Sequence, residues 1–253
     1  MIQISESYII ITCESDTDPR FNRLQLRTVP PTFIDLQPGK NKLSIKDYPN
    51  LKYGFRQIEN LLIDDEESNC EYNCGSVRSI DLSHFDSSEV TQMNNMFERM
   101  ACLSHINFGS IRFKNITSIE NAFDWVNAGL FTDGDLLDLS NIDFSQILDT
   151  TEMLYGCNFA TVNLTGCDMS KVKRAYGMFE NCRISKLILN ESKLSNAVIE
   201  AITQEVREWT CLEEVSLKGC EMDTIKLIVN GLTFDRPETW DSIKFILDKN
   251  SRF

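Results

Sequence analysis

The chain has 253 residues, 42% of them hydrophobic, so it can bury a sizeable core, and intrinsic disorder is excluded as its main state. It carries 25 Lys and Arg against 38 Asp and Glu, a net charge of −13, and this acidic excess disfavours direct binding to a nucleic-acid backbone. No apolar run reaches the ~18 residues of a membrane span. Residues 1–14 lack the features of a secretory signal. We therefore expect a cytoplasmic protein, or a cell-surface protein if a signal peptide has been removed or missed.

Residues 1–50 have the pattern of a small β-rich N-terminal region or cap. Five of the six prolines lie before residue 50, and this shift in composition indicates a boundary there. Short apolar or alternating runs separated by turn residues predict strands at Tyr8–Cys13, Leu24–Leu26, Phe33–Leu36 and Leu43–Ile45. Residues 51–75, which include the acidic run 64–67, are expected to form a linker or a partial capping repeat.

Internal repeats dominate the chain from residue 76 onwards. Four segments of sixteen residues align without a gap, and they start at Leu82, Phe108, Leu139 and Leu164, with spacings of 26, 31 and 25 residues. Apolar or small residues recur at shared offsets: Phe85, Ile111, Ile142 and Cys167; Val90, Ile116, Ile147 and Val172; Met96, Ala122, Met153 and Met178; Phe97, Phe123, Leu154 and Phe179. Agreement at so many offsets predicts one structural unit per repeat.

An apolar pair with one residue between its members opens each repeat, as in Ile80 and Leu82. Weaker pairs follow at 187 and 189, at 215 and 217, and at 243 and 245. One coil cannot bury its apolar side chains alone, whereas stacked coils share a continuous core. The pattern therefore predicts a solenoid over residues 76–253, in which the paired positions form a parallel β-sheet.

The first repeat, LSHFDSSEVTQMNNMF, resembles the repeats of the BspA-type leucine-rich repeat family of bacteria. The matching residues are Leu82, Ser83, Phe85, Asp86, Ser88, Val90, Met93, Met96 and Phe97. This resemblance extends over about residues 76–190 and implies an α/β leucine-rich-repeat solenoid with its parallel sheet on the concave face. The second repeat departs from the pattern, because Arg112 stands where Asp86 and Asp168 stand in other repeats.

Residues 191–253 are expected to form helical repeats and a C-terminal cap. Apolar residues at helical spacing predict a helix over residues 195–209, with Ser195 as its N-cap. A second, short helix is expected over residues 223–230, with Gly231 ending it.

The outward positions of a solenoid sheet form columns and are the usual ligand surface of such a fold. We predict a partner-binding column at Asp81, Asn107, Asp138, Asn163 and Ser216, with Lys244 as its last member. His105 lies in the flanking column. A solvated polar face that serves only solubility is the alternative interpretation.

The second repeat is about five residues longer than its neighbours, and insertions in solenoids map to surface loops. We therefore predict an irregular binding element at residues 125–135, with Trp125 and Phe131 as its aromatic anchors. The alternative is that one of these aromatic side chains packs into the core. The recurring Asp86, Asp143 and Asp168 are interpreted as local caps of backbone N–H groups, because a catalytic pair needs to occur only once.

Residues that commonly carry catalysis are scarce. The chain has two histidines, and the common motifs for phosphate binding, a serine nucleophile elbow and a zinc protease are missing. Nine cysteines in a chain of this length predict buried free thiols, and Cys70, Cys74 and His84 lack a fourth zinc ligand. We expect no cofactor, no metal and no enzymatic activity.

The sequence thus favours a protein–protein interaction module whose partner we expect to be basic, with no direct nucleic-acid contact. An exported cell-surface adhesin is the alternative implied by the family resemblance, and an enzyme of unknown reaction is the third. The oligomeric state is left open.

Overall fold

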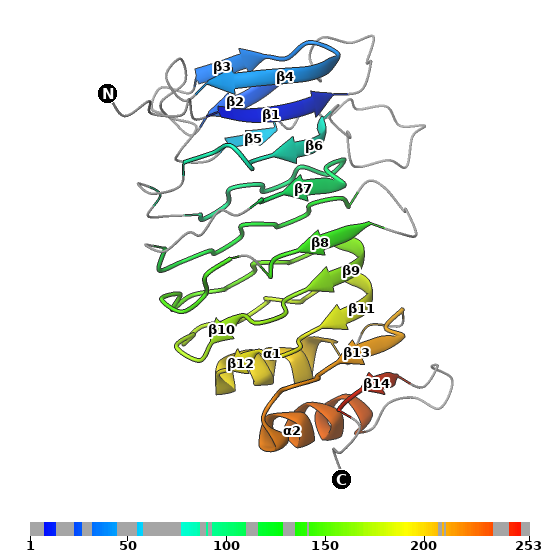
Figure 1. Cartoon of the computed structure of the whole chain (residues 1–253). Coiled ribbons are helices and arrows are strands. Elements are labelled where there is room, and N and C mark those ends of the chain that lie inside the picture. Colours follow the sequence, from blue (N-terminus) through cyan, green and yellow to red (C-terminus); the bar gives the residue numbers. More distant parts are fainter. Residues whose placement is uncertain are drawn as a thin grey trace.

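The computed structural model describes residues 8–13, 23–26, 32–44, 55–57, 77–86, 90, 93–109, 116–128, 135–140, 142–206, 209, 211–234 and 243–248. Successive coils stack on one another from the N-terminal strands to the C-terminal helices (Figure 1). The described elements, in chain order, are β1 (Tyr8–Cys13), β2 (Arg23–Leu26), β3 (Thr32–Asp35), β4 (Gly39–Ser44), β5 (Phe55–Gln57), β6 (Val77–Asp81), β7 (His105–Asn107), β8 (Leu136–Asp138), β9 (Asn158–Asn163), β10 (Asp168–Met169), β11 (Arg183–Ile188), β12 (Lys193–Leu194), α1 (Asn196–Glu205), β13 (Glu214–Ser216), α2 (Met222–Thr233) and β14 (Lys244–Ile246).

The predicted solenoid with a parallel sheet is confirmed. Strand β6 pairs in parallel with β7, and β8, β9, β11, β13 and β14 form a second run of parallel strands. Strands β7 and β8 lie next to each other, so the two runs follow one another along the stack (Figure 1). In the described residues the fold is mostly strand and turn, and its helices are α1 and α2.

The N-terminal strands extend the solenoid sheet. Strand β1 pairs antiparallel with β6 on one side and with β4 on the other, which gives the order β4-β1-β6-β7. Strands β3, β2 and β5 form a separate antiparallel sheet. Because β1 covers β6, the first parallel strand does not offer an open edge to other chains.

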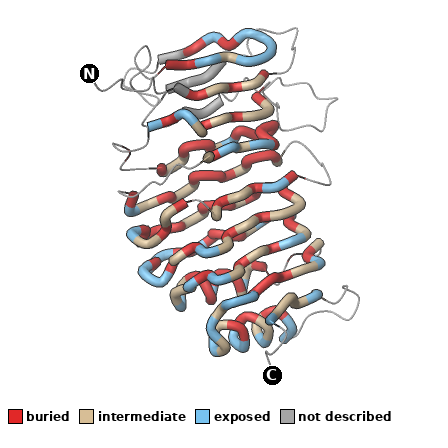
Figure 2. The backbone as a smooth tube through the Cα atoms, viewed as in Figure 1, coloured by how far each residue is buried: buried red, intermediate tan, exposed pale blue. Residues whose placement is uncertain are grey.

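The core runs along the inside of the stack (Figure 2). The described residues at the shared repeat offsets are buried: Phe85, Ile142 and Cys167; Val90, Ile116, Ile147 and Val172; Met96, Ala122, Met153 and Met178; Phe97, Phe123, Leu154 and Phe179. The rings of Phe97 and Phe123 stack with centroids 5.4 Å apart, and Phe108 meets both edge-on. The aligned repeats therefore stack residue on residue, as the sequence predicts.

Each of the first four repeats has a turn segment where a helix could stand: residues 94–99, 120–125, 151–156 and 176–181. We call the side of the solenoid formed by these four stacked segments the turn face. Alternate N–H groups donate to the next coil, as Asn95, Phe97 and Arg99 do to the carbonyls of residues 120, 122 and 124. Each of these coils has two residues with positive φ, four positions apart: Asn95 and Arg99, Asn121 and Trp125, Glu152 and Gly156, Gly177 and Asn181. A positive φ lies outside the right-handed helical region, so the chain cannot form helical hydrogen bonds here and these N–H groups bond between coils.

The C-terminal coils replace this ladder with helices. Helix α1 begins after Ser195, whose hydroxyl accepts a hydrogen bond from the Val198 N–H at 3.3 Å, as predicted. The expectation that Gly231 ends the second helix is wrong, because α2 continues to Thr233. A Cβ atom at Gly231 would lie 2.3 Å from Cγ2 of Thr203. This glycine therefore allows α2 to approach α1 closely instead of capping a helix.

Candidate functional site

The outward side chains of β6, β7, β8, β9, β11, β13 and β14, which we call the sheet face, include most of the predicted partner-binding residues. Oδ1 of Asp81 accepts hydrogen bonds from the Ser83 N–H at 2.8 Å and from the Asn107 side chain at 3.1 Å. Oδ1 of Asn107 in turn accepts from the Gly109 N–H at 2.9 Å. The first two members of the predicted column are therefore held in place before any partner binds.

The next two members repeat this arrangement. Oδ1 of Asp138 accepts from the Ser140 N–H at 3.1 Å and from the Asn163 side chain at 3.0 Å. Asn163 itself accepts from the N–H of Thr165 at 3.0 Å. Asx-type bonds of this kind fix the turn after each strand, so these four side chains have a structural role whatever else they bind.

Ser216 continues the predicted column, because it pairs with Ile188, which pairs with Asn163, whereas Lys244 does not. Ser216 is buried, and its hydroxyl donates to Oδ1 of Asn190 at 2.7 Å. Lys244 pairs with Glu214 in the flanking column, because Phe245 is the partner of Val215 in the register of the sheet. The sequence alignment placed this last weak repeat two residues out of register.

The flanking column is the more exposed part of the sheet face. His105 pairs with Ser79, and Leu136 is followed by Thr161, Lys186, Glu214 and Lys244 in successive strands. The side chain of Leu136 is 47% exposed, whereas His105 and Lys186 are exposed polar residues. The flanking column therefore presents one exposed apolar side chain on an otherwise polar surface.

The start of the predicted insertion is part of the coil packing. Trp125 lies on the turn face with φ of 52°, and its ring meets that of Tyr155 edge-on with centroids 6.0 Å apart. Asn127 is fully buried, and its side-chain N–H groups donate to Oδ2 of Asp135 and to the carbonyl of Asn158. Phe131 lies outside the described residues. Trp125 is therefore packed against the next coil.

The interpretation of the recurring aspartates as local caps is confirmed for Asp143 and Asp168. Oδ1 of Asp143 accepts from the Ser145 N–H at 3.0 Å, and Oδ1 of Asp168 accepts from Ser170. The pKa of Asp168 is lowered, chiefly by the hydrogen bond from the Ser170 hydroxyl and further by Lys193. Burial acts in the opposite direction but is the weaker effect.

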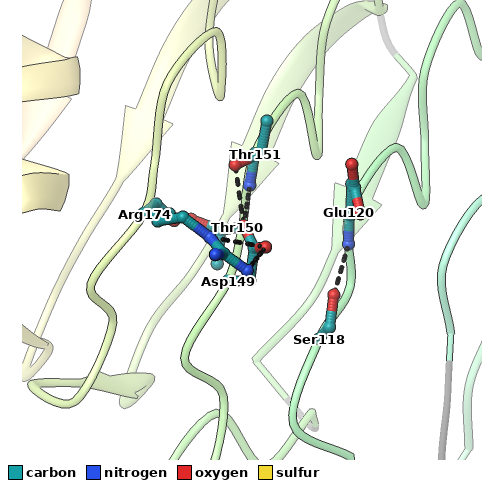
Figure 3. A network of polar contacts seen from close by, with 6 residues as sticks. All are labelled: Ser118, Glu120, Asp149, Thr150, Thr151 and Arg174. Atoms are coloured by element: carbon teal, nitrogen blue, oxygen red, sulfur yellow. Dashed lines mark hydrogen bonds and ion pairs between the residues drawn. The ribbon is translucent and has the colours of Figure 1, made fainter.

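A polar network that the sequence analysis missed lies beside the turn face (Figure 3). Asp149 is buried and accepts bonds from the N–H and hydroxyl of Thr151 and, at 2.9 Å, from Nε of Arg174. Burial raises the pKa of Asp149, but the bonds from Thr151 and Arg174 outweigh it, so the pKa is lowered. Asp149 and Arg174 occupy the same position in successive repeats, 25 residues apart. Opposite charges at one aligned position would have predicted this ion pair from the sequence.

The described residues offer no arrangement with clear catalytic geometry. The hydroxyl of Ser104 lies 2.8 Å from Nδ1 of His105, but Ser104 is buried and its hydroxyl also lies 3.4 Å from the carbonyl of Arg78. Within the described part of the chain, no group of His, Cys, Asp and Glu side chains could hold a metal ion. Cys70 and Cys74 lie outside that part.

The described cysteines are free thiols, as predicted: Cys13, Cys102, Cys157, Cys167, Cys182, Cys211 and Cys220. Burial raises the pKa values of the Cys167, Cys182 and Cys220 thiols. At one repeat position the donors Cys167, Ser192 and Cys220 each lie within hydrogen-bonding distance of a carbonyl in the preceding coil, those of Leu139, Leu164 and Leu189. These residues act as structural donors in the core.

Comparison with known proteins gives one match. Residues 68–192 match the family described as "Mycoplasma protein of unknown function, DUF285". Together with the stacked coils, this match indicates a repeat protein. No curated protein and no solved structure matches the chain. None of the described helices is long and apolar enough to cross a membrane.

Proposed function

We propose that the protein is a leucine-rich-repeat module of the BspA type that binds a protein partner through its sheet face. The exposed flanking column carries this proposal, because it places Leu136 among polar side chains on a surface built from successive coils. The neighbouring Asp81–Asn107 and Asp138–Asn163 bonds hold the surface rigid. A rigid surface loses little conformational entropy on binding, which favours affinity.

A non-enzymatic role fits the repeat architecture and the buried position of Ser104. The basic partner expected from the net charge would meet Asp81 and Asp138 at the N-terminal coils, whereas Lys186 and Lys244 lie at the C-terminal coils. A partner with both charge signs along its length would therefore fit the whole face best.

Two exposed leucines allow a matched test of the sheet face. Leu136→Glu places a charge on the sheet face, and Leu227→Glu places the same charge on α2, where Leu227 is 53% exposed. Tagged wild-type protein should capture a partner from native lysate, Leu136→Glu should lose it, and Leu227→Glu should retain it. Equal capture by both variants, measured by quantitative mass spectrometry, would remove the sheet face as the binding surface.

A further inference from the structure

The turn face carries one aromatic side chain on each of three successive coils: Trp125, Tyr155 and Tyr176. Tyr176 is 73% exposed, and Trp125 and Tyr155 are partly exposed. The indole of Trp125 lies over Gly156, where a Cβ atom would be 2.9 Å from Cδ2 of the ring. The Asn181 side chain donates to the Tyr155 hydroxyl at 2.8 Å. The rings of Trp125 and Tyr155 are therefore fixed in place without a partner.

Two glutamate side chains lie close to the backbone next to Tyr176. A Cβ atom at Gly177, the residue after Tyr176, would lie 2.9 Å from Cγ of Glu152 and 3.7 Å from Oε2 of Glu180. Both glutamates thus converge on the same glycine from adjacent coils. In the described part of the chain, no ion pair involves either of them.

Aromatic faces attract cations, and Arg or Lys beside a ring and a carboxylate gains from both interactions. The rings lie on three successive coils, so a single small cation cannot contact all of them, whereas an extended chain can. The net charge of −13 also steers positively charged partners toward the protein.

We propose that the turn face binds a basic segment of a protein partner, whose Arg or Lys side chains stack on Trp125, Tyr155 and Tyr176 and pair with Glu152 and Glu180. The inference rests on the proposed role as a protein-binding module and adds a second surface with its own partner chemistry. The sheet-face aspartates Asp81 and Asp138 are bonded within the ladder, whereas Glu152 and Glu180 form no ion pair with a described cation.

Fluorescence anisotropy with a labelled peptide of alternating arginine and serine tests this surface directly. Wild-type protein should bind this peptide at low salt, and should not bind a matched peptide of alternating glutamate and serine. Tyr176→Ala should weaken binding about 2- to 5-fold, as expected for an exposed cation–π contact. The double variant Glu152→Gln/Glu180→Gln should weaken binding of the arginine peptide about 2- to 10-fold, as expected for two partly exposed charge pairs.

The control is Glu213→Gln/Glu221→Gln, which removes two exposed carboxylates elsewhere on the surface and should change affinity less than about 2-fold. Melting curves check that every variant is folded. The proposal is overturned if the control weakens binding as much as Glu152→Gln/Glu180→Gln, if Tyr176→Ala has no effect, or if no peptide binds. Partner capture that depends on Leu136 would survive each of these outcomes, so the two proposals fail separately.

Discussion

The coils that end in turns and the coils that end in helices share one parallel sheet but satisfy their backbones differently. In the turn coils, N–H groups such as those of Glu152, Leu154 and Gly156 donate to carbonyls of the next coil. In α1 and α2 the helical N–H groups bond within one coil. The change of pattern leaves the last turn coil without carbonyls to receive its N–H groups.

Glu205, at the end of α1, fills this gap. Its Oε1 accepts from the Gly177 N–H at 2.8 Å and its Oε2 accepts from the Phe179 N–H at 2.9 Å. Four residues later in the sequence, Nε1 of Trp209 donates to the Phe179 carbonyl at 3.0 Å. A carboxylate thus replaces two carbonyls of a missing turn coil, and the comparison shows that one sheet can join two kinds of repeat if their junction is capped.

The largest effect should come from emptying the core of each region in turn. Phe123→Ala in the turn coils should lower the free energy of unfolding by about 3–5 kcal/mol, and Ile228→Ala in α2 by about 2–5 kcal/mol, since both side chains are fully buried. Because β11 and β13 pair directly, each variant should still unfold in one transition. Two separate transitions in urea denaturation would show that the regions are independent.

Removing the junction cap should have the next largest effect. Glu205→Ala leaves the N–H groups of Gly177 and Phe179, both buried residues, without an acceptor, so we expect a loss of about 2–4 kcal/mol. Glu205→Gln keeps one acceptor and should lose less. Glu200→Gln on the exposed side of α1 is the matched control and should change stability by less than about 0.5 kcal/mol. A control loss equal to that of Glu205→Ala would refute the capping role.

The sequence predicts the repeats well because each aligned apolar position faces one continuous core. It also predicts the start of α1 at Ser195, because an N-cap residue bonds to an N–H group only three residues away. The end of α2 is mispredicted because it depends on a neighbouring segment, α1, whose Thr203 lies against Gly231. The role of Glu205 has no local signal, because its two hydrogen-bond donors lie 28 and 26 residues away.

The dependence of stability on pH should differ in sign between Glu205 in α1 and Asp149 in the turn coils. Burial raises the pKa of Glu205 above its ordinary 4.5, against the opposing N–H bonds, so its contribution to stability is complete below pH 4.5 and is lost as pH rises through the raised pKa. The pKa of Asp149 is lowered from 3.8, because hydrogen bonds outweigh burial. Its contribution is present above pH 3.8 and is lost as pH falls through the lowered pKa.

Two variants, Glu205→Gln and Asp149→Asn, test how each carboxyl group changes stability with pH. Urea denaturation at a series of pH values should show that Glu205→Gln removes part of the decline above pH 4.5, and that Asp149→Asn removes part of the decline below pH 3.8. Each variant serves as the control for the other. If either variant altered the opposite limb of the profile, the assignment of that limb to its carboxyl group would be wrong.

The smallest effect should come from adding a reductant, because the described cysteines of both regions are already free thiols. Sγ of Cys157 and Sγ of Cys182 lie 3.7 Å apart in the turn coils, and Cys220 donates to the Leu189 carbonyl at the first helical coil. A disulfide requires a separation near 2.05 Å, so neither contact is a covalent bond. We expect a thiol count near nine in non-reducing denaturant and no shift in melting temperature on adding reductant. A count near one would contradict this, and a reductant-sensitive melt of the wild type that Cys157→Ser abolishes would identify the turn coils as the oxidised region.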